Sequence, residues 1–238
     1  MAQPRHIAII ADGNRRWAVA HGKKPIVGHK VAVERTINLA LKLREDKEIN
    51  VDYLTLWGFS TENWKRSKEE VQSLMNFFYT GLKKVKGLFT KHKIKLMTIG
   101  RRDRLPRKLV KLICEIEEAT KHFSSPAVCL ALDYGGRDEI LRAVNKAIKL
   151  GKTLKDGDFD LLLDTNGIPN PDMIIRTGGE KRLSGFLPWQ GAYAELFFVK
   201  YPYPELDIEK LKVLINEFER RVRTFGGTAK KKGYEKYK

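Results

Sequence analysis

A carboxylate, an amide and two arginines follow directly on a short apolar run near the start of the chain. The run is HIAII at residues 6–10, and the group after it is Asp12, Gly13, Asn14, Arg15, Arg16 and Trp17. Backbone N–H groups at a helix start bind anions, and a glycine there lets the anion approach. Arginines add charge-assisted hydrogen bonds to phosphate. The alternative is an Asx-type turn that only caps the helix, and this stretch alone favours neither interpretation.

Asp12 is the unexpected member of this group, because a carboxylate repels a bare phosphate. A magnesium ion shared between Asp12 and a diphosphate removes that repulsion, since Mg2+ is commonly held by one or two carboxylates together with substrate phosphates. The loops of common nucleotide-binding enzymes are excluded, because neither G-x-x-x-x-G-K-[ST] nor G-x-G-x-x-G occurs in the chain. The residues therefore indicate phosphate binding by another route.

Two later stretches, GFSTENWKRS at residues 58–67 and IIRTGGEKRLSG at residues 174–185, also gather polar groups. The first holds Ser60, Thr61, Glu62, Asn63, Trp64 and Arg66, and the second holds Arg176, Arg182, Leu183 and Ser184 around a Gly-Gly turn. Dense polar groups on a loop indicate a site, and paired arginines with a hydroxyl can clamp a second diphosphate. The alternatives are turn roles for Ser60 and Asn63, a core position for Trp64, and a basic surface loop.

Two isolated residues have two interpretations each. His29, in VGHK, is either a phosphate ligand or a structural histidine, and Glu195, near the start of an apolar run, is either a metal ligand or an exposed carboxylate. No H-E-x-x-H motif and no C-x-x-C pair is present, so a zinc site is not expected.

Six short apolar runs, each ending in polar or glycine-rich residues, predict buried strands. They begin at about residues 6, 53, 94, 128, 173 and 195. Apolar residues at helical spacing predict helices around 33–41, 69–91, 109–116, 140–148 and 211–218, and Ser67 with Glu70 predicts a capping box. Strand–helix alternation indicates an α/β fold, an open parallel sheet with helices on both faces. We expect a single domain over residues 1–238.

The carboxyl ends of parallel strands form one edge of such a sheet, where ligands bind. Most of the candidate residues follow a strand, as do Arg101, Arg102 and Arg137, and the collection of arginines there indicates phosphate ligands. The helix at 69–91 is apolar over more than one stripe, through Met75, Phe77, Phe78, Tyr79 and Leu82. Such a helix is either core or the lining of an apolar cavity for lipid.

The net charge of +17 in 238 residues also points to an anionic partner. RNA is one alternative, motivated by IGRRDRLPRK at residues 99–108, although no RNP-like aromatic motif accompanies it. The basic residues 228–238 predict a mobile tail that anionic lipid could attract. The two cysteines, Cys114 and Cys129, have no redox or metal spacing, and we expect neither a signal peptide nor a membrane span. A cytoplasmic protein with peripheral membrane contact is the resulting expectation.

The blocks HIAIIADGNRRWA, GHK, GFSTENWKRS, IIRTGGEKRLSGFLPWQGAYAELFF and RTFGG, in this order, resemble the cis-prenyltransferases. These are the undecaprenyl and dehydrodolichyl diphosphate synthases, and the likeness runs from about His6 to Gly227, with FSTENWKRSKEE as close to archaeal and eukaryotic members as to bacterial ones. The resemblance implies condensation of isopentenyl diphosphate onto an allylic prenyl diphosphate, farnesyl or geranylgeranyl, with new cis double bonds. It also implies six parallel strands, an apolar tunnel for the growing chain, Mg2+, a homodimer and no nucleic-acid partner.

Residue by residue, the resemblance assigns Asp12 to magnesium and to diphosphate departure. It assigns the allylic diphosphate to Gly13, Asn14, Arg15 and Arg16, flanked by Trp17 and His29. The block Ser60, Thr61, Glu62, Asn63, Trp64 and Arg66 would position the substrates, with Asn63 and Ser60 assisting proton removal. Arg176, Arg182, Leu183 and Ser184 would hold isopentenyl diphosphate, and Glu195 would be a second magnesium-linked carboxylate near the dimer interface.

One position departs from the family pattern. Many bacterial members have an arginine four residues before the histidine of GH, where this chain has Pro25, preceded by Lys23 and Lys24. Either a lysine substitutes or the allylic diphosphate is held differently. A non-catalytic subunit of a prenyltransferase complex is the remaining alternative, against which the retained site residues count.

Overall fold

The structure is a computed structural model that describes residues 2–151, 153–155 and 157–224. Its strands are β1 (His6–Ile10), β2 (Tyr53–Ser60), β3 (Lys95–Ile99), β4 (Ala127–Tyr134), β5 (Met173–Arg176) and β6 (Glu195–Phe198). Its α-helices are α1 (Asn14–Ala20), α2 (Pro25–Glu45), α3 (Lys68–Lys91), α4 (Arg107–Thr120), α5 (Gly136–Leu150) and α6 (Ile208–Arg220). Short 3-10 helices are η1 (Thr61–Lys65), η2 (Asp160–Leu162) and η3 (Tyr203–Glu205). The basic tail expected at 228–238 lies outside the described residues.

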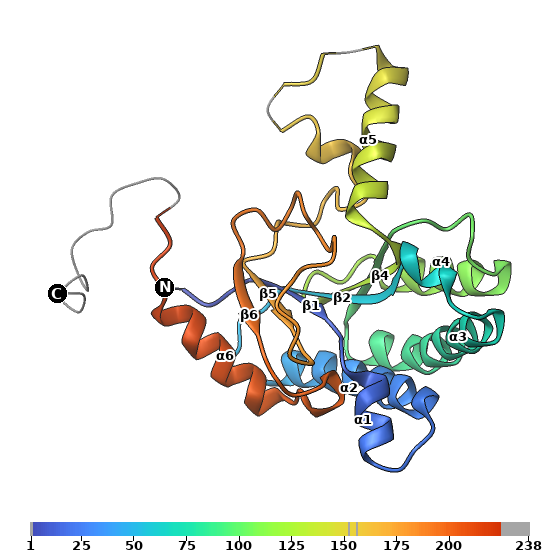
Figure 1. The fold of residues 1–238 in the computed structure, drawn as a ribbon. Coiled ribbons are helices and arrows are strands. Elements are labelled where there is room, and N and C mark those ends of the chain that lie inside the picture. Colours follow the sequence, from blue (N-terminus) through green and yellow to red (C-terminus); the bar gives the residue numbers. More distant parts are fainter. Residues whose placement is uncertain (1, 152, 156, 225–238) are drawn as a thin grey trace.

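The strands form one sheet in the order β3-β4-β2-β1-β5-β6, and every neighbouring pair is parallel. Strands β1, β4 and β5 are buried along almost their whole length, which is the pattern of a covered parallel sheet, whereas the edge strands β3 and β6 are only partly buried. The sequence prediction of a single α/β domain with six parallel strands is confirmed (Figure 1). All carboxyl ends of the strands therefore lie at one edge.

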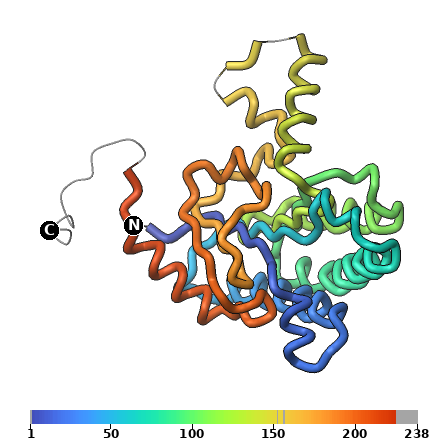
Figure 2. The backbone as a smooth tube through the Cα atoms, in the orientation of Figure 1, coloured from blue at the N-terminus to red at the C-terminus, as the bar shows by residue number. Residues whose placement is uncertain are grey.

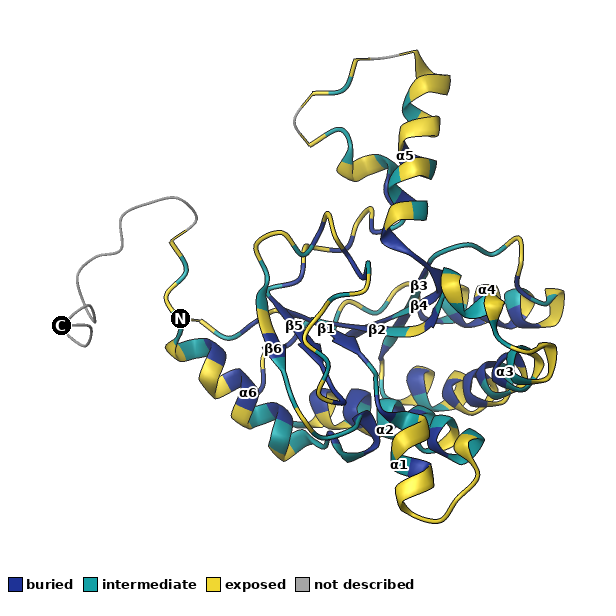
Figure 3. Cartoon of the chain, viewed as in Figure 1, coloured by how far each residue is buried: buried dark blue, intermediate teal, exposed yellow. Residues whose placement is uncertain are grey.

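One face of the sheet packs on helices. Ile7, Ile9, Leu54 and Leu56 belong to the same core as the apolar sides of α2, α3, α4 and α6. The amphipathic spacing of those helices predicts this arrangement, because one apolar stripe of each must be covered. Figure 3 shows the buried side of each helix turned toward the sheet. This layer holds the larger of the two cores.

The other face has a different cover. Small side chains, Ala8, Cys129 and Ala131, point to this side and leave room for Phe186 and Leu187. The Phe186 ring stacks on Trp57 at a centroid distance of 5.0 Å. This cover comes from the two segments that flank β5, residues 159–172 and 177–194, which are irregular apart from η2. Helix α5 begins beside the second segment, where the Gly136 N–H donates to the Gly185 carbonyl at 2.9 Å. Four helices thus pack on the first face, whereas loops supply most of the cover of the second.

Helix α5 and the chain that follows it project from the body as an arm (Figures 1 and 2). Leu141, Val144 and Ile148 lie along one side of this helix and are exposed, Ile148 by 70%. Their spacing of three and four residues makes them a continuous apolar stripe. Within the described residues, none of the helices is both long and apolar enough to cross a membrane.

Candidate active site

A cavity of about 450 Å3 opens at the carboxyl edge of β1, β2 and β5 and continues between the sheet, α2 and α3. Its mouth is polar and its far end is apolar. The polar side chains that line it are Asp12, Asn14, His29, Thr36, Ser60, Glu62, Asn63, Arg66, Arg176, Ser184 and Tyr203. The expected meeting of strand-end residues from distant parts of the chain therefore occurs here.

Asp12 is held by residues at the ends of two neighbouring strands, β1 and β5. Its Oδ2 accepts a hydrogen bond from Arg176 Nη2 at 2.9 Å, and its Oδ1 accepts the Gly13 N–H at 2.6 Å. The Thr177 hydroxyl donates to the Asp12 carbonyl at 2.8 Å and accepts the Asp12 N–H at 3.0 Å. Because β1 and β5 are neighbours, Arg176 at the end of β5 reaches Asp12 directly. The carboxylate and the backbone that carries it are thus both fixed.

The charge of Asp12 is favoured by these contacts. Burial raises the pKa of Asp12, but the hydrogen bonds from Arg176 and from Gly13 outweigh burial, and the pKa lies below its ordinary value. Arg16 adds a longer contact at 3.4 Å. Asp12 is therefore an ionised carboxylate at neutral pH.

Two glycines allow this close assembly. Gly13 has a φ of +89°, and a Cβ on it would lie 2.7 Å from Cβ of Pro202. Gly178, with a φ of +82°, passes so close to Asp12 that a Cβ would lie 3.1 Å from the Asp12 carbonyl carbon. Left-handed backbone without a side chain is what glycine alone supplies easily.

Polar atoms without partners are concentrated in this cavity. Among the described residues, the buried side-chain nitrogen or oxygen atoms that lack a hydrogen bond are Asn14 Oδ1, His29 Nε2, Arg176 Nε and Gln190 Oε1. Asn14, His29 and Arg176 all line the cavity. Buried polar groups are rarely left unpaired, so their convergence indicates a polar ligand.

His29 sits beside charged neighbours. Burial and, to a smaller extent, the nearby guanidinium of Arg66 lower the pKa of His29 to about 4. The carboxylate of Glu70 acts in the opposite direction. A neutral imidazole offers one donor and one acceptor. His29 is thus able to bind a phosphate oxygen by a hydrogen bond without carrying a charge.

The segment after β2 forms a compact polar turn. The Asn63 Oδ1 accepts the Ser60 N–H at 3.0 Å, and the Ser60 hydroxyl oxygen accepts the Glu62 N–H at 3.0 Å, which together cap η1. The Ser60 hydroxyl donates to Glu62. Burial raises the pKa of Glu62, but the hydrogen bond from Ser60 helps to leave it below its ordinary value. The Asn63 oxygen is therefore used by the backbone, and its amide NH2 group is the part left for a ligand.

Glu70 joins two of the predicted arginines. Arg15 and Arg66 contact its Oε1 at 3.2 and 3.0 Å. The predicted N-cap of α3 is confirmed, because Ser67 accepts the Glu70 N–H at 3.2 Å. The other half of the expected capping box is replaced, since the Glu70 carboxylate turns to the two arginines. These guanidiniums are consequently aligned near the cavity mouth while keeping unused N–H donors.

The loop after β5 folds back over Arg176. Arg176 Nη1 donates to the Ser184 hydroxyl at 2.9 Å and to the Arg182 carbonyl. Ser184 has a φ of +53°. The Arg182 side chain is exposed and pairs with Glu180, and Leu183 packs into the second core. Arg176 and Ser184 therefore line the cavity, whereas the side chains of Arg182 and Leu183 do not.

Some predicted site residues lie elsewhere. Trp17 packs on His21 at 4.4 Å, with Lys23 Nζ 5.2 Å from the indole centre. Thr61 lies against Gly135, where a Cβ would be 2.3 Å from its hydroxyl. None of these side chains belongs to the described lining of the cavity. Pro25 is the first residue of α2, and Lys24 caps that helix.

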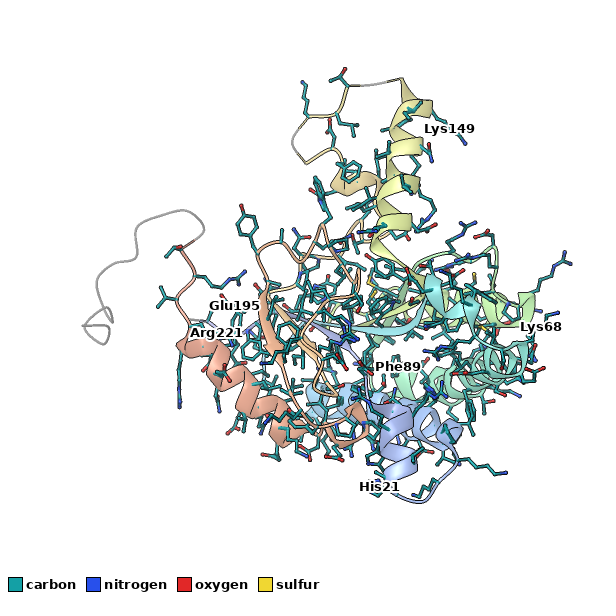
Figure 4. All side chains as sticks on the ribbon, viewed as in Figure 1. His21, Lys68, Phe89, Lys149, Glu195 and Arg221 are labelled. Atoms are coloured by element: carbon teal, nitrogen blue, oxygen red, sulfur yellow. The ribbon has the colours of Figure 1, made fainter. Side chains whose placement is uncertain are left out.

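Glu195 is far from Asp12 within one chain. It begins β6 and is in register with Met173, the first residue of β5, so it lies at the opposite edge of the sheet. There it accepts a hydrogen bond from Arg221 at 2.8 Å, as the labelled pair in Figure 4 shows. Two carboxylates at opposite strand ends cannot share an ion within one chain.

The arginines after β3 and β4 are not gathered at the cavity either. Arg101 pairs with Asp103 at 2.6 Å and Arg102 with Glu117 at 2.8 Å, and Arg137 is exposed. The collection of arginines at this edge is therefore partly a set of structural ion pairs.

The far end of the cavity is apolar. It is lined by Leu56, Leu74, Phe77, Phe78, Leu82, Val85, Phe89, Leu96, Val128 and Leu130. Phe77, Phe78 and Leu82 belong to the α3 stripe that we expected to be core or cavity lining, whereas Met75 and Tyr79 of that stripe do not line the cavity. Phe89, labelled in Figure 4, comes from the last turns of α3 and lies beneath the sheet. A long apolar chain entering at Asp12 would be accommodated along α3.

Several residues were missed by the sequence analysis. Thr177, Glu70 and the hydroxyl pair of Thr36 and Tyr203, 2.8 Å apart, all belong to the site or support it. Thr177 could have been found, because it lies between Arg176 and the Gly-Gly turn. Thr36 and Tyr203 could not, because nothing local in the sequence places them together.

Comparisons with known proteins agree with this geometry. Residues 10–226 match the family described as "Putative undecaprenyl diphosphate synthase". An isoprenyl transferase of Aquifex pyrophilus is 44% identical, covering 94% of this chain and 96% of that protein. One from Thermotoga maritima is 40% identical, covering 95% of this chain and 98% of that protein.

Two solved structures are similar throughout. Lavandulyl diphosphate synthase from Lavandula x intermedia, solved with dimethylallyl diphosphate, has a TM-score of 0.87 and 32% identity, covering 94% of this chain and 98% of that one. A "probable undecaprenyl diphosphate synthase" from Campylobacter jejuni has a TM-score of 0.78 and 34% identity, covering 95% and 100%. The chain is thus a prenyltransferase enzyme, and it belongs to the undecaprenyl diphosphate synthase family.

Proposed function

We propose that this enzyme condenses isopentenyl diphosphate with an allylic prenyl diphosphate, farnesyl or geranylgeranyl, to extend a polyprenyl diphosphate with cis double bonds. The observation that carries the proposal is the cavity itself, which joins a mouth of unpaired buried polar atoms to an apolar channel along α3. Only an amphiphile with an anionic head and a long apolar tail matches both ends. A prenyl diphosphate has that chemistry.

Magnesium is the expected cofactor, and Asp12 would hold it. Among the described residues, no cluster of three or more His, Cys, Asp or Glu side chains could hold a metal ion. A single ionised carboxylate at the mouth suits Mg2+ bound mainly through substrate phosphates. When bound, the ion would offset the negative charge of the diphosphate that departs.

The chain's own residues would then orient two anions that repel each other. Arg15, Arg16, Asn14 and His29 would face the allylic diphosphate, and Arg176 with Ser184 would face isopentenyl diphosphate. Fixed cations in a partly dry cavity stabilise developing charge more than water does. Holding the two carbons in line converts a reaction between two molecules into one within a complex.

The chemical step breaks the bond between the allylic carbon and the diphosphate oxygen and forms a carbon–carbon bond to the isopentenyl double bond. A proton leaves the isopentenyl unit. Asn63 and Ser60 would position that unit, Asn63 through its amide NH2 group, because its oxygen caps η1. An amide is a poor base, and the released diphosphate is the expected proton acceptor.

We further expect a homodimer. The exposed apolar stripe of α5, formed by Leu141, Val144 and Ile148, and the sheet edge at β6 are the surfaces that a second copy would cover. Exposed contiguous apolar surface is typical of protein contacts. Glu195 lies on β6, so a second copy is also the route by which its carboxylate would approach an active site.

Peripheral contact with a membrane is expected for an enzyme whose product is a long lipid. The net charge of +17 would favour an anionic membrane surface. A cytoplasmic location is consistent with the two cysteines, which are not paired with each other.

The test is turnover of the purified chain with isopentenyl diphosphate and Mg2+, offered dimethylallyl, geranyl, farnesyl or geranylgeranyl diphosphate as primer. We expect radiolabelled isopentenyl diphosphate to enter an extractable lipid, and we expect EDTA to stop it. Full activity in EDTA would contradict the magnesium assignment. Absence of product from every primer would leave the non-catalytic subunit as the better interpretation.

A further inference from the structure

A carboxylate outside the cavity connects three separate segments of the chain. Asp133, the next-to-last residue of β4, is fully buried. Its Oδ1 accepts the indole N–H of Trp64 at 2.8 Å, and its Oδ2 accepts Arg104 Nε at 2.7 Å. A second guanidinium nitrogen of Arg104 also donates to Oδ1. Asp133 thus links β4, the loop after β3 and the 3-10 helix η1.

The contact with η1 is made through Trp64, an aromatic side chain that is itself partly buried against the core. Trp64 packs edge-on against Phe59 at 5.2 Å, and the Arg104 guanidinium lies 5.6 Å from its ring centre. The backbone supports the carboxylate as well, since the Arg101 N–H donates to the Asp133 carbonyl at 3.1 Å. Trp64 is therefore fixed at its nitrogen and at its ring.

This arrangement has an unfavourable contribution to the free energy of folding. A buried carboxylate loses its hydration and is tolerated only with a cation and hydrogen bonds. Asp133 also has a φ of +50°, a left-handed conformation that costs of order 1 kcal/mol or more outside glycine. Both features are unnecessary for merely closing a core, which an apolar side chain would do better.

The segment that Trp64 anchors carries cavity residues. Ser60, Glu62 and Asn63 all line the cavity and lie within four residues of Trp64. The cap between Ser60 and Asn63 makes η1 one rigid turn. A rotation of Trp64 would therefore move all three polar side chains together.

We propose that Asp133 and Arg104 form a positioning pair for η1, acting through Trp64 to aim Ser60, Glu62 and Asn63 into the active-site cavity. Neither Asp133 nor Arg104 lines the cavity, so neither is a catalytic residue. The proposal rests on the proposed function, because it assumes that the η1 residues face the substrate. The proposal predicts how well the substrate is positioned, and it does not predict whether the enzyme is active.

The chain offers a matched control. Arg102 and Arg104 lie in the same loop, and each makes two hydrogen bonds to one carboxylate, with side chains exposed by 39% and 36%. Glu117, the partner of Arg102, is on α4 and bonds to Thr98 rather than to η1. Arg104→Gln and Arg102→Gln therefore each remove an arginine–carboxylate pair from the same loop, although Asp133 is fully buried and Glu117 is 24% exposed, and only the Asp133 pair supports η1.

The experiment measures kcat and KM for isopentenyl diphosphate, together with thermal unfolding, for Arg104→Gln, Arg102→Gln and Asn63→Ala. We expect Arg104→Gln to raise KM by about tenfold or more, the scale on which misplaced groups are felt. Arg102→Gln should leave KM within about twofold of wild type, because Glu117 does not contact η1. If both arginine variants change KM equally, or neither does, the positioning pair is wrong.

A second variant keeps the test informative if Arg104→Gln unfolds. Trp64→Phe retains an aromatic ring against Phe59 and removes the N–H that Asp133 accepts, together with part of the indole volume. We expect the same rise in KM, and in the double variant with Arg104→Gln a rise smaller than the product of the two, since both act through one contact. A Trp64→Phe enzyme with wild-type KM would overturn the proposal.

Asn63→Ala separates this inference from the function on which it rests. If that change leaves both kcat and KM at wild-type values, η1 does not face the substrate and the assigned site is wrong. If Asn63→Ala impairs the enzyme while Arg104→Gln behaves like Arg102→Gln, only the positioning role of Asp133 fails.

Discussion

Single residues at the cavity mouth depend on one another through the pair of Asp12 and Arg176. Arg176 is only 5% exposed and still bonds to Asp12, Ser184 and the Arg182 carbonyl. A guanidinium can make these contacts in several directions at once, and a lysine ammonium cannot. The pair therefore sets both the charge and the orientation of the groups that we propose to bind phosphate.

Replacing Asp12 with asparagine should remove the charge that we propose to bind Mg2+ while preserving the local shape. We expect kcat to fall by about 10²–10³ or more, the range seen when one stabilising group of a transition state is lost. Circular dichroism should be unchanged, since Gly13 can still donate to the amide oxygen. An Asp12→Asn enzyme with nearly normal turnover would show that Asp12 holds no essential ion.

A histidine outside the site should control stability at acid pH. His6 is buried, its Nδ1 donates to the Pro169 carbonyl at 2.6 Å, and its Nε2 contacts the Thr55 hydroxyl at 2.8 Å. Burial is the main cause that lowers the pKa of His6 to about 4. The unfolded chain therefore takes up a proton first as pH falls below about 6.5, and stability is lost between that pH and 4.

The expected size is about 2 kcal/mol of unfolding free energy lost between pH 7.5 and pH 5 from His6 alone. Urea unfolding at the two pH values measures it. His29, whose pKa is lowered in the same direction, should add to the effect. A His6→Asn variant should lose a correspondingly smaller amount over this interval, and an equal loss in variant and wild type would contradict the assignment.

At the scale of secondary-structure elements, α3 is both a wall of the core and the lining of the channel. Val33 on α2 approaches Gly81 on α3 so closely that a Cβ on Gly81 would lie 2.7 Å from Val33 Cγ1. The two helices thus fix the width of the channel, while large side chains near the end of α3 limit its depth.

Shortening Phe89 should deepen the channel. Phe89→Ala is expected to lengthen the product, measured by thin-layer sizing, and to cost about 3–5 kcal/mol of stability. Phe218→Ala on α6 is the control, because Phe218 is equally buried but does not line the cavity. If both variants shift product length equally, or if neither does, the channel is not the path of the growing chain.

The sequence predicted the strands and the start of α3, but it did not predict the ion pairs that the side chains at their ends make. Each strand was recognisable because it is a short apolar run, and Ser67 correctly marked the start of α3. Arg101 and Arg102 follow β3 as expected, but Asp138 and Glu117, which engage them, come from distant helices. Long-range ion pairs of this kind leave no local pattern.

Glu195 illustrates a rule that was available but was not applied to this residue. Residues that follow a parallel strand lie at the carboxyl edge, and Asp12 and Ser184 conform. Glu195 precedes its apolar run, and the same rule places it at the amino edge, where it is found. The cover of the second face could not be anticipated, because the segments on either side of β5, residues 159–172 and 177–194, are mostly irregular and have no periodicity.

At the scale of the whole molecule, the body and the arm have different surfaces. The body buries its apolar helix faces, whereas the α5 arm exposes Leu141 by 63% and Ile148 by 70% (Figure 3). A contiguous apolar stripe on a projecting helix is typical of a surface that contacts another molecule. A second copy of the chain is the partner that we propose.

Charge placed on that stripe should separate the subunits. Ile148→Glu, combined with Leu141→Glu, is expected to convert the dimer to a monomer in analytical ultracentrifugation, because an interface cannot bury unpaired carboxylates. Val19→Glu is the control, since Val19 is 62% exposed on α1, at the far end of the molecule from α5. A wild-type chain that is monomeric at micromolar concentration would exclude the proposed interface.

The central claim is that one cavity binds two diphosphates at its mouth and a growing prenyl chain along α3. Its most direct test is to incubate the wild-type chain with Mg2+, labelled isopentenyl diphosphate and farnesyl diphosphate, and to determine the geometry of the double bonds in the product. We predict a polyprenyl diphosphate whose newly formed double bonds are all cis, with Asp12→Ala as the blank. New trans double bonds, or no elongation of farnesyl diphosphate or any other allylic primer, would contradict the account.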